Sequence, residues 1–245
     1  MKKLPVPVIS IIIDDLGYQL KQGTRAVNLP GKITFSFLPY SPYAKKLAEQ
    51  AHQRQQEIFV HMPMQSDEAK KMGPGGLHQA MSEVELVKTV KDDLSAVPHA
   101  VGFNNHMGSL LTRMDTTMET VMKAAYRPGL YFIDSKTTHD SVALQHARRV
   151  GIYSAIRDVF LDHVKTRQFI ENQLDTLVKQ ARTKGTAIAI GHPYKITLEI
   201  LEQWIPHVEA QGVKLVSVSE LIQLREQRRL AWQKSSSRSP RAVKN

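Results

Sequence analysis

A run of β-branched residues near the start of the chain constrains its fold more than any other feature. Residues 9–13 read Ile-Ser-Ile-Ile-Ile and lead directly into Asp14, Asp15, Leu16 and Gly17. Such a run is typical of a strand buried on both faces of a parallel sheet. Successive strand residues point to opposite faces, so the two carboxylates should reach different surroundings. The acids could instead cap the next helix, since Asp is favoured at helix starts.

Seven further apolar segments resemble strands, and helical signals separate them. The eight segments are residues 8–13, 33–38, 57–62, 100–104, 130–134, 152–156, 186–191 and 213–218. The sequence Ser82-Glu83-Val84-Glu85, for example, is a capping box that opens an amphipathic helix. Alternating strands and helices predict a single-domain, irregular (β/α) barrel of about seven strands. A doubly wound open sheet is the main alternative.

Positive charge is concentrated at the C-terminus. The formal charge is +10, and residues 225–245 hold seven Lys or Arg and one Glu, which leaves +4 for residues 1–224. We divide the chain into a lead (1–7), the barrel (8–224) and a basic extension (225–245) whose polar composition predicts disorder. Residues 1–224 are only mildly basic, which does not indicate a nucleic-acid partner. No apolar run approaches the roughly 20 residues of a transmembrane segment, and without cysteine there is no disulfide or thiolate site.

Polar side chains follow six of the predicted strands. They include Asp14 and Asp15, His61, Asn104, Asn105 and His106, Asp134 and Ser135, Arg157 and Asp158, and His192. In a parallel barrel the carboxyl ends of all strands meet at one mouth, where such proteins carry their active sites. The sequence therefore predicts one polar site at that mouth.

One carboxylate and two imidazoles are a typical ligand set for a hydrolytic metal ion, with a position left open. Asp15, His61 and His106 supply that set. Each histidine alone could equally be a hydrogen-bonded, partly buried imidazole, but the three together favour a metal. If they bind one divalent ion, zinc being favoured, their ligand atoms should lie within roughly 3–4 Å of one another.

Two more residues complete a catalytic hypothesis. Asp14 would be free to act as a general base toward water, and His192 could protonate a leaving group. The His192-Pro193 pair could also be no more than a rigid turn. Asn104 or Asn105 could orient a metal ligand or satisfy a strand end. Further candidates for substrate contact or ligand support are Asp134, Ser135 and Asp158.

The chain resembles the divergent polysaccharide deacetylase family over about residues 8–224. The resemblance rests on Ile13-Asp14-Asp15-Leu16-Gly17, His61-Met62-Pro63-Met64, Gly102-Phe103-Asn104-Asn105-His106-Met107-Gly108-Ser109, Asp134-Ser135 and Gly191-His192-Pro193. Related metal-dependent deacetylases have an irregular barrel, a base followed by a metal ligand in the paired-Asp motif, and a histidine acid in the final motif. The resemblance implies these roles for Asp14, Asp15 and His192, a carbohydrate substrate, and a periplasmic or other extracytoplasmic location.

The sequence departs from those enzymes at two points. Their metal histidines come from one H-x-x-x-H segment, whereas here His61 is followed by Gln65, so we infer that His106 supplies the second imidazole. Their Arg-containing motif is absent. The favoured function is deacetylation of an N-acetylated polysaccharide or oligosaccharide. The alternative is a non-catalytic carbohydrate-binding or cell-envelope protein that retains the barrel and metal site. The N-terminus lacks signal-peptide features, which leaves a cytoplasmic location open.

Overall fold

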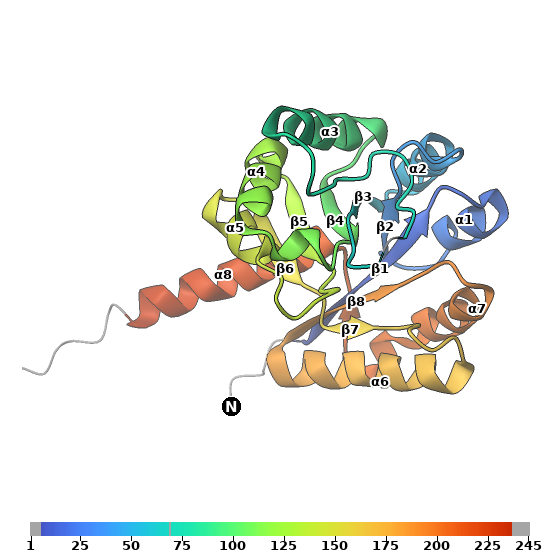
Figure 1. The fold of residues 1–245 in the computed structure, drawn as a ribbon. Helices are drawn as coiled ribbons and strands as arrows, with labels where there is room; N and C mark the ends of the chain where they lie inside the picture. The colour runs from blue at the N-terminus through green and yellow to red at the C-terminus, as the bar shows by residue number, and fades with distance from the viewer. Residues whose placement is uncertain (1–5, 69, 237–245) are drawn as a thin grey trace, which may run out of the picture.

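The computed structural model describes residues 6–68 and 70–236, in which nine strands form one sheet (Figure 1). The strands are β1 (Val8–Leu16), β2 (Thr34–Phe37), β3 (Glu57–Met64), β4 (Gly102–Met107), β5 (Tyr131–Asp134), β6 (Tyr153–Ile156), β7 (Val159–Phe160), β8 (Thr186–Gly191) and β9 (Lys214–Leu215). The pairings between these strands are all parallel. Their order is β6-β5-β4-β3-β2-β1-β8-β7, with β9 beside β1.

Helices connect most successive strands, and α3 and α6 have recognisable capping residues. They are α1 (Leu20–Val27), α2 (Ala44–Gln53), α3 (Glu83–Ala96), α4 (Asp115–Ala125), α5 (Ala143–Arg149), α6 (Arg167–Lys184), α7 (Lys195–Trp204) and α8 (Val218–Ser236), with short 3-10 turns at Leu111–Arg113, Ile205–His207 and Glu209–Gln211. The predicted capping box opens α3, where Ser82 N donates to the Glu85 carboxylate at 2.8 Å. Helix α6 ends at Gly185, whose φ of 85° suits a residue without a side chain.

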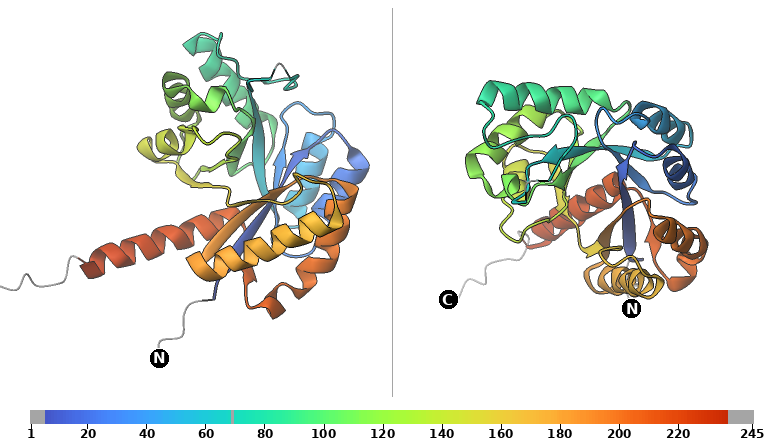
Figure 2. Two further views of the ribbon diagram at one scale, coloured as in Figure 1. Left: turned by 60° about the horizontal axis from the view of Figure 1, so that its bottom comes forward. Right: turned by 45° about the vertical axis from the view of Figure 1, so that its right-hand side comes forward.

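The strand order distinguishes a barrel from a doubly wound sheet. From β1 to β6 the spatial order follows the chain without the reversal that a doubly wound sheet has at its switch point. The sheet curls, and helices α1 to α7 lie around its outside (Figures 1 and 2). The predicted irregular (β/α) barrel is therefore confirmed.

The two edges of the curled sheet are linked by the chain itself. Strand β6 pairs with β5 at one edge, and β7 pairs with β8 at the other. Only Arg157 and Asp158 separate β6 from β7. The chain thus crosses from one edge to the other at these two residues, which places them next to the interior of the barrel.

Apolar side chains fill both sides of the sheet. The larger cluster lies between the strands and the outer helices and includes Ile11 and Phe103. A second cluster lies inside the barrel, where Ile12 and Phe59 pack with Leu221 of α8. Helix α8 thereby closes the end of the barrel at which the strands begin, and the opposite end remains as the mouth.

Glu57, at the start of β3, anchors α8 against the barrel. Its carboxylate accepts hydrogen bonds from Val218 N at 2.9 Å, Ser219 N at 3.2 Å and Thr34 Oγ1 at 2.7 Å. We expect Glu57→Ala to lower the free energy of unfolding by about 1–3 kcal/mol, because buried donors lose their acceptor. Urea unfolding followed by circular dichroism measures the change, with the exposed Glu209→Ala as control. Equal stabilities of the two variants would contradict an anchoring role.

Helix α8 extends further than the sequence predicts. We expected disorder from residue 225, but the helix continues to Ser236. Its attachment explains the difference, because Arg225 Nε donates to Thr186 Oγ1 at 2.8 Å and Arg225 Nη2 pairs with Asp158 at 3.1 Å. Beyond these contacts the helix projects from the barrel (Figure 2). The rest of the predicted extension (237–245) and residues 1–5 of the lead lie outside the described residues.

Within residues 6–68 and 70–236, no helix is both long enough and apolar enough to cross a bilayer.

Candidate metal centre and active site

Both aspartates at the end of β1 reach the mouth because the strand is distorted there. Regular alternation would turn Asp14 and Asp15 to opposite faces. Asp15, however, has a φ of 57°, and the register with β2 shifts between Ile13 and Leu16. This backbone conformation is uncommon for a residue with a side chain, although Asp tolerates it better than most. The distortion brings the Asp15 carboxylate into the same cavity as that of Asp14.

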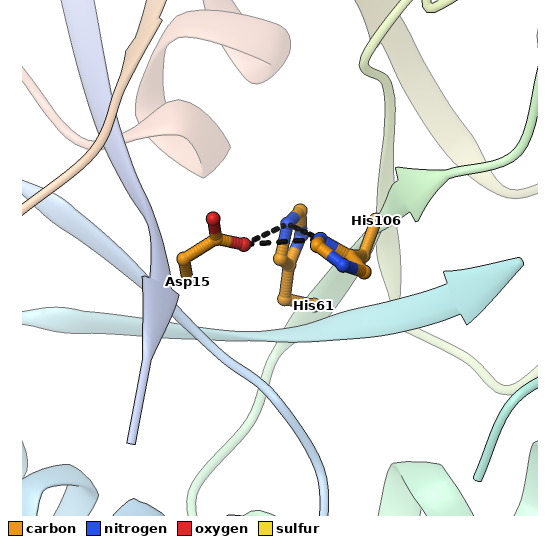
Figure 3. Close-up of side chains that lie close together, drawn as sticks. All are labelled: Asp15, His61 and His106. Carbon is orange, nitrogen blue, oxygen red and sulfur yellow. Dashed lines mark hydrogen bonds and ion pairs between the residues drawn. The ribbon is translucent and has the colours of Figure 1, made fainter. Parts of the chain in front are cut away.

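Asp15, His61 and His106 form a cluster of three potential metal ligands (Figure 3). Asp15 Oδ1 lies 3.2 Å from His61 Nε2 and 3.0 Å from His106 Nδ1, and the two nitrogens are 3.1 Å apart. The histidines face the same side because β3 and β4 are neighbours and Pro63, two residues after His61, pairs with His106. These separations lie within the roughly 3–4 Å expected of atoms that share an ion. Their role as ligands stays a prediction.

Asn104 orients both His61 and Asp14. Its Nδ2 donates to the two carboxylate oxygens of Asp14 at 2.9 and 3.0 Å, so its Oδ1 accepts from His61 Nδ1 at 2.8 Å. Neutral His61 must then carry its hydrogen on Nδ1, which leaves Nε2 free to face the cluster. Ser36 Oγ also donates to Asn104 Oδ1, at 2.6 Å. Metal-ligating histidines generally have a partner of this kind.

The atoms of the cluster fit a divalent cation. Asp15 Oδ1 is buried and accepts no hydrogen bond from the described residues, although two imidazole nitrogens are close. Burial would raise the pKa of Asp15, but the attraction of His106 and His61 outweighs it and holds that pKa well below its usual range. A carboxylate that stays ionised beside two facing imidazole nitrogens is an arrangement that a cation would complete. One carboxylate with two imidazoles suits zinc.

His192, at the end of β8, faces the cluster and is held by Asp162. Its Nδ1 donates to Asp162 Oδ1 at 2.9 Å, and its Nε2 lies 3.8 Å from Asp15 Oδ2. Asp162 Oδ2 also accepts from His192 N at 2.7 Å and from Thr197 Oγ1 at 2.9 Å. We predicted no specific role for Asp162 from the sequence. Its position shortly after the sixth predicted strand was the one available signal.

Asp162 controls the protonation of His192. Burial would lower the pKa of His192, but the hydrogen bond and charge of Asp162, with smaller contributions from Asp15 and Asp14, raise it to about 9. We expect Asp162→Asn to lower this pKa from about 9 toward the ordinary value of 6.5 in the metal-free protein, as measured by NMR titration. The exposed Asp175→Asn is the control, and an unchanged His192 pKa in Asp162→Asn would contradict the assignment.

The raised pKa of His192 makes its contribution to the stability of the fold depend on pH. The folded-state pKa of His192, about 9, lies above the ordinary value of 6.5. The interaction therefore stabilises the fold fully below about pH 6.5, and this contribution is lost as the pH rises through about 9.

Three other predicted site residues shape the wall of the mouth. Asn105 Oδ1 accepts from Ser135 N at 2.8 Å, which ties the ends of β4 and β5 together. Ser135 lines the cavity, and its buried Oγ has no hydrogen-bond partner among the described residues. The Asp134 carboxylate accepts from Lys136 N at 2.8 Å and Ser141 Oγ at 2.7 Å. Asp134 thus holds the turn that carries Ser135.

Asp158 is not brought to the mouth. Its carboxylate accepts from Ile188 N at 3.0 Å and pairs with Arg225 at 3.1 Å and Lys184 at 3.4 Å. These partners lie where α8 and α6 meet the start of β8. The contacts indicate that Asp158 fastens α8, whereas we expected it to contact substrate or support the ligands.

Arg157, the residue before Asp158, does line the cavity, as its place after a predicted strand suggested, although we predicted no specific role for it. Its Nε donates to Ser135 O at 2.8 Å and its Nη2 to Lys136 O at 3.2 Å. Burial lowers the pKa of Arg157, and the negative charges of Asp14, Asp134 and Asp158 partly offset that effect. The Arg-containing motif is missing from the sequence, yet the crossing between β6 and β7 brings a guanidinium to the cavity that the paired aspartates line.

Removal of Asn104 tests its supporting role. We expect Asn104→Ala to weaken zinc binding by about 10–100-fold, the usual effect of losing a group that orients a metal ligand. Competition with a chromophoric chelator measures the affinity. The exposed Asn172→Ala is the matched control. An Asn104→Ala variant that binds zinc like the wild type would show that His61 needs no orientation.

These observations define a parallel (β/α)-barrel protein with an aspartate–histidine cluster, suited to a metal, at its mouth. The chain belongs to the divergent polysaccharide deacetylase family, whose sequence pattern matches residues 11–222. The uncharacterized protein YibQ of Escherichia coli K12 is 34% identical to it over 214 residues, which cover 87% of this chain and 67% of YibQ.

Solved structures extend the similarity of the fold. The uncharacterized protein ATU2773 of Agrobacterium tumefaciens superposes with a TM-score of 0.85 at 21% identity, over 90% of this chain and 91% of that one. The peptidoglycan deacetylase PdaC of Bacillus subtilis gives 0.54 at 18% identity, over 96% and 98% of the chains. BA3943 of Bacillus anthracis, a CE4 family pseudoenzyme, gives 0.52 at 14% identity, over 90% and 66%. Since this fold occurs in a deacetylase and in a pseudoenzyme, the site must decide between catalysis and binding.

Proposed function

We propose that this protein is a metal-dependent hydrolase that removes acetyl groups from an N-acetylated polysaccharide or oligosaccharide. The observation that carries the proposal is the convergence of Asp15, His61 and His106 beside a buried carboxylate, Asp14, and a histidine–aspartate pair. Membership of the divergent polysaccharide deacetylase family supports this choice of reaction and substrate. The same membership favours action on the cell envelope, outside the cytoplasm.

Asp15, His61 and His106 would hold the metal ion, with zinc as the favoured metal. When bound, a divalent cation supplies Lewis acidity, which polarises a carbonyl oxygen and makes water more acidic. Asn104 would keep His61 Nε2 directed at the ion through the hydrogen bond at Nδ1. The cavity shared by Asp14, Asp15 and His192 leaves room for the acetamide group on the open side of the cluster.

Asp14 would act as the general base. Burial raises its pKa, partly offset by His61, His192 and Asn104, and a base works best when its pKa approaches the working pH. The two hydrogen bonds from Asn104 fix the orientation of the carboxylate. In this position Asp14 would take the proton from the attacking water.

His192 would act as the general acid. Its Nδ1 is engaged by Asp162, so Nε2 is the atom that faces the cavity. The pKa of about 9 keeps the imidazole protonated at neutral pH. His192 would therefore give a proton to the departing amine as the C–N bond breaks, which leaves acetate and a free amino sugar.

Acetate release decides between catalysis and binding. The zinc-loaded protein is incubated with chitin-type and peptidoglycan-type oligosaccharides, and acetate and new amino groups are quantified. We expect release of acetate that requires both the metal and Asp14. Saturable oligosaccharide binding without acetate from either type would contradict the proposal and favour a non-catalytic carbohydrate-binding protein.

A further inference from the structure

Two cavities open on either side of the metal-type cluster and differ in chemical character. Asp15, His106 and His192 border both of them. The first, about 350 Å³, is lined by Tyr18 and Tyr194. The second, about 380 Å³, is lined by a group of residues that we call the cationic wall: Ser135, Lys136, Arg157 and His163. Each volume is typical of a small-ligand site.

The charges that border the second cavity become unbalanced when a metal is present. Its acidic lining residues are Asp14 and Asp15, and its strongly basic ones are Lys136 and Arg157. A divalent cation at the cluster would offset the charges of the two carboxylates, so that Lys136 and Arg157 would give the lining of this cavity an excess of positive charge. The negative charges of Asp134 and Asp158, which are not among the lining residues, also act on Arg157, while Asp134 accepts the hydrogen bonds of its own turn and Asp158 pairs with Arg225.

The guanidinium of Arg157 is fixed rather than free. Hydrogen bonds from Nε to Ser135 O and from Nη2 to Lys136 O hold it, and its Cζ lies 5.0 Å from the centre of the Phe160 ring. Among the described residues no carboxylate forms a salt bridge with Arg157. A pre-oriented guanidinium without a carboxylate partner is suited to binding an anionic oxygen group.

Ser135 offers a hydroxyl group at the same place. Its Oγ is buried in the cavity wall and has no hydrogen-bond partner among the described residues. A hydroxyl in this position can donate a hydrogen bond to an oxygen atom of a ligand in the cavity. Ser135 and Arg157 are in direct contact through Ser135 O.

We propose that the cationic wall binds an anionic oxygen group of the substrate, a carboxylate or a phosphate, next to the acetamide. The substrate is then an anionic N-acetylated sugar rather than a neutral one. This inference rests on the proposed function, because it assumes that the acetamide lies at the metal-type cluster.

Paired ligands test the inference by binding, independently of catalysis. Calorimetry on the zinc-loaded protein compares N-acetylmuramic acid with its methyl ester, and N-acetylglucosamine 6-phosphate with N-acetylglucosamine. We expect the charged member of at least one pair to bind 10-fold or more tightly, and the pair that responds identifies carboxylate or phosphate. Equal affinities within both pairs, or no binding of any member, would overturn the inference.

Variants show whether the wall, and not the metal, recognises the charge. Lys136→Gln and Arg157→Gln should each reduce the preference for the charged ligand over its uncharged partner at least threefold. Lys179→Gln makes an equal change of charge on the exposed side of α6 and should leave that preference unchanged. A preference that persists in both wall variants would overturn the inference. Acetate release from the charged ligands and from peptidoglycan-type oligosaccharides is assayed separately. Its absence together with a retained charge preference would contradict only the proposed function.

Discussion

The Asp14→Asn variant is expected to release acetate about 10²–10⁴-fold more slowly than the wild type, the range typical for loss of a general base. The amide has nearly the same shape as the carboxylate but cannot accept the proton from water at neutral pH. Asp14 is not one of the three residues whose atoms meet in the cluster. Zinc affinity should therefore stay within a few-fold of the wild-type value.

This combination of results separates the base from the ligands. Initial rates of acetate release are measured at saturating zinc, and the zinc affinity is measured in parallel. Asp175→Asn, an exposed change on α6, is the matched control and should retain full activity. Wild-type turnover in Asp14→Asn would remove Asp14 from the mechanism, and loss of zinc would instead make Asp14 a ligand.

His61→Ala and His106→Ala are expected to produce the second large effect, a loss of zinc affinity. Removal of a group that only orients a ligand lowers metal affinity by about 10–100-fold. Loss of a ligand itself should therefore lower zinc affinity by more than that. The fold should persist, because the apolar core and not the metal stabilises a barrel of this size.

Calorimetric zinc titration measures the zinc affinity of each variant. Far-ultraviolet circular dichroism of the metal-free variants shows whether the fold persists. His139→Ala removes an exposed imidazole and serves as control. Unchanged zinc affinity in either His61→Ala or His106→Ala would exclude that histidine from the site. Unfolding of both variants would indicate a structural rather than a catalytic type of cluster.

The sequence allowed the cluster to be predicted because strand periodicity and strand order determine it. The Ile9–Ile13 run marks a strand buried on both faces, and its end lies at the mouth. His61 and His106 meet because neighbouring parallel strands bring their ends together. The same register explains why Asn104, level with His61, supports it, while Asn105 points the other way and reaches β5.

Local backbone distortion was beyond prediction. Alternation alone would turn Asp14 and Asp15 to opposite faces. Nothing in the residue pattern indicates that Asp15 adopts a φ of 57°, which brings both carboxylates to the mouth. Similarly, β7 has only two residues and therefore no periodicity. Without it the crossing from β6 could not be foreseen, so no specific role was predicted for Arg157, and Asp158 was expected at the mouth rather than beside α8.

Tertiary contacts also override composition at the C-terminus. The polar, basic sequence after residue 224 predicts disorder, but Arg225 and Arg228 contact the barrel, at Asp158 and at Gly185 O. Asp162 illustrates the same limit, because its importance follows from its bonds to His192 and Thr197 and not from any pattern around it.

X-ray absorption spectroscopy at the zinc edge, on protein loaded with one equivalent of zinc, tests the central claim most directly. We expect one tightly bound zinc per chain with two imidazole nitrogens at about 2.0–2.1 Å and a carboxylate oxygen at about 2.0–2.2 Å. The imidazole signal should decrease by one ligand in His106→Ala. A spectrum with oxygen ligands alone, unchanged in His106→Ala, would contradict a metal centre formed by Asp15, His61 and His106.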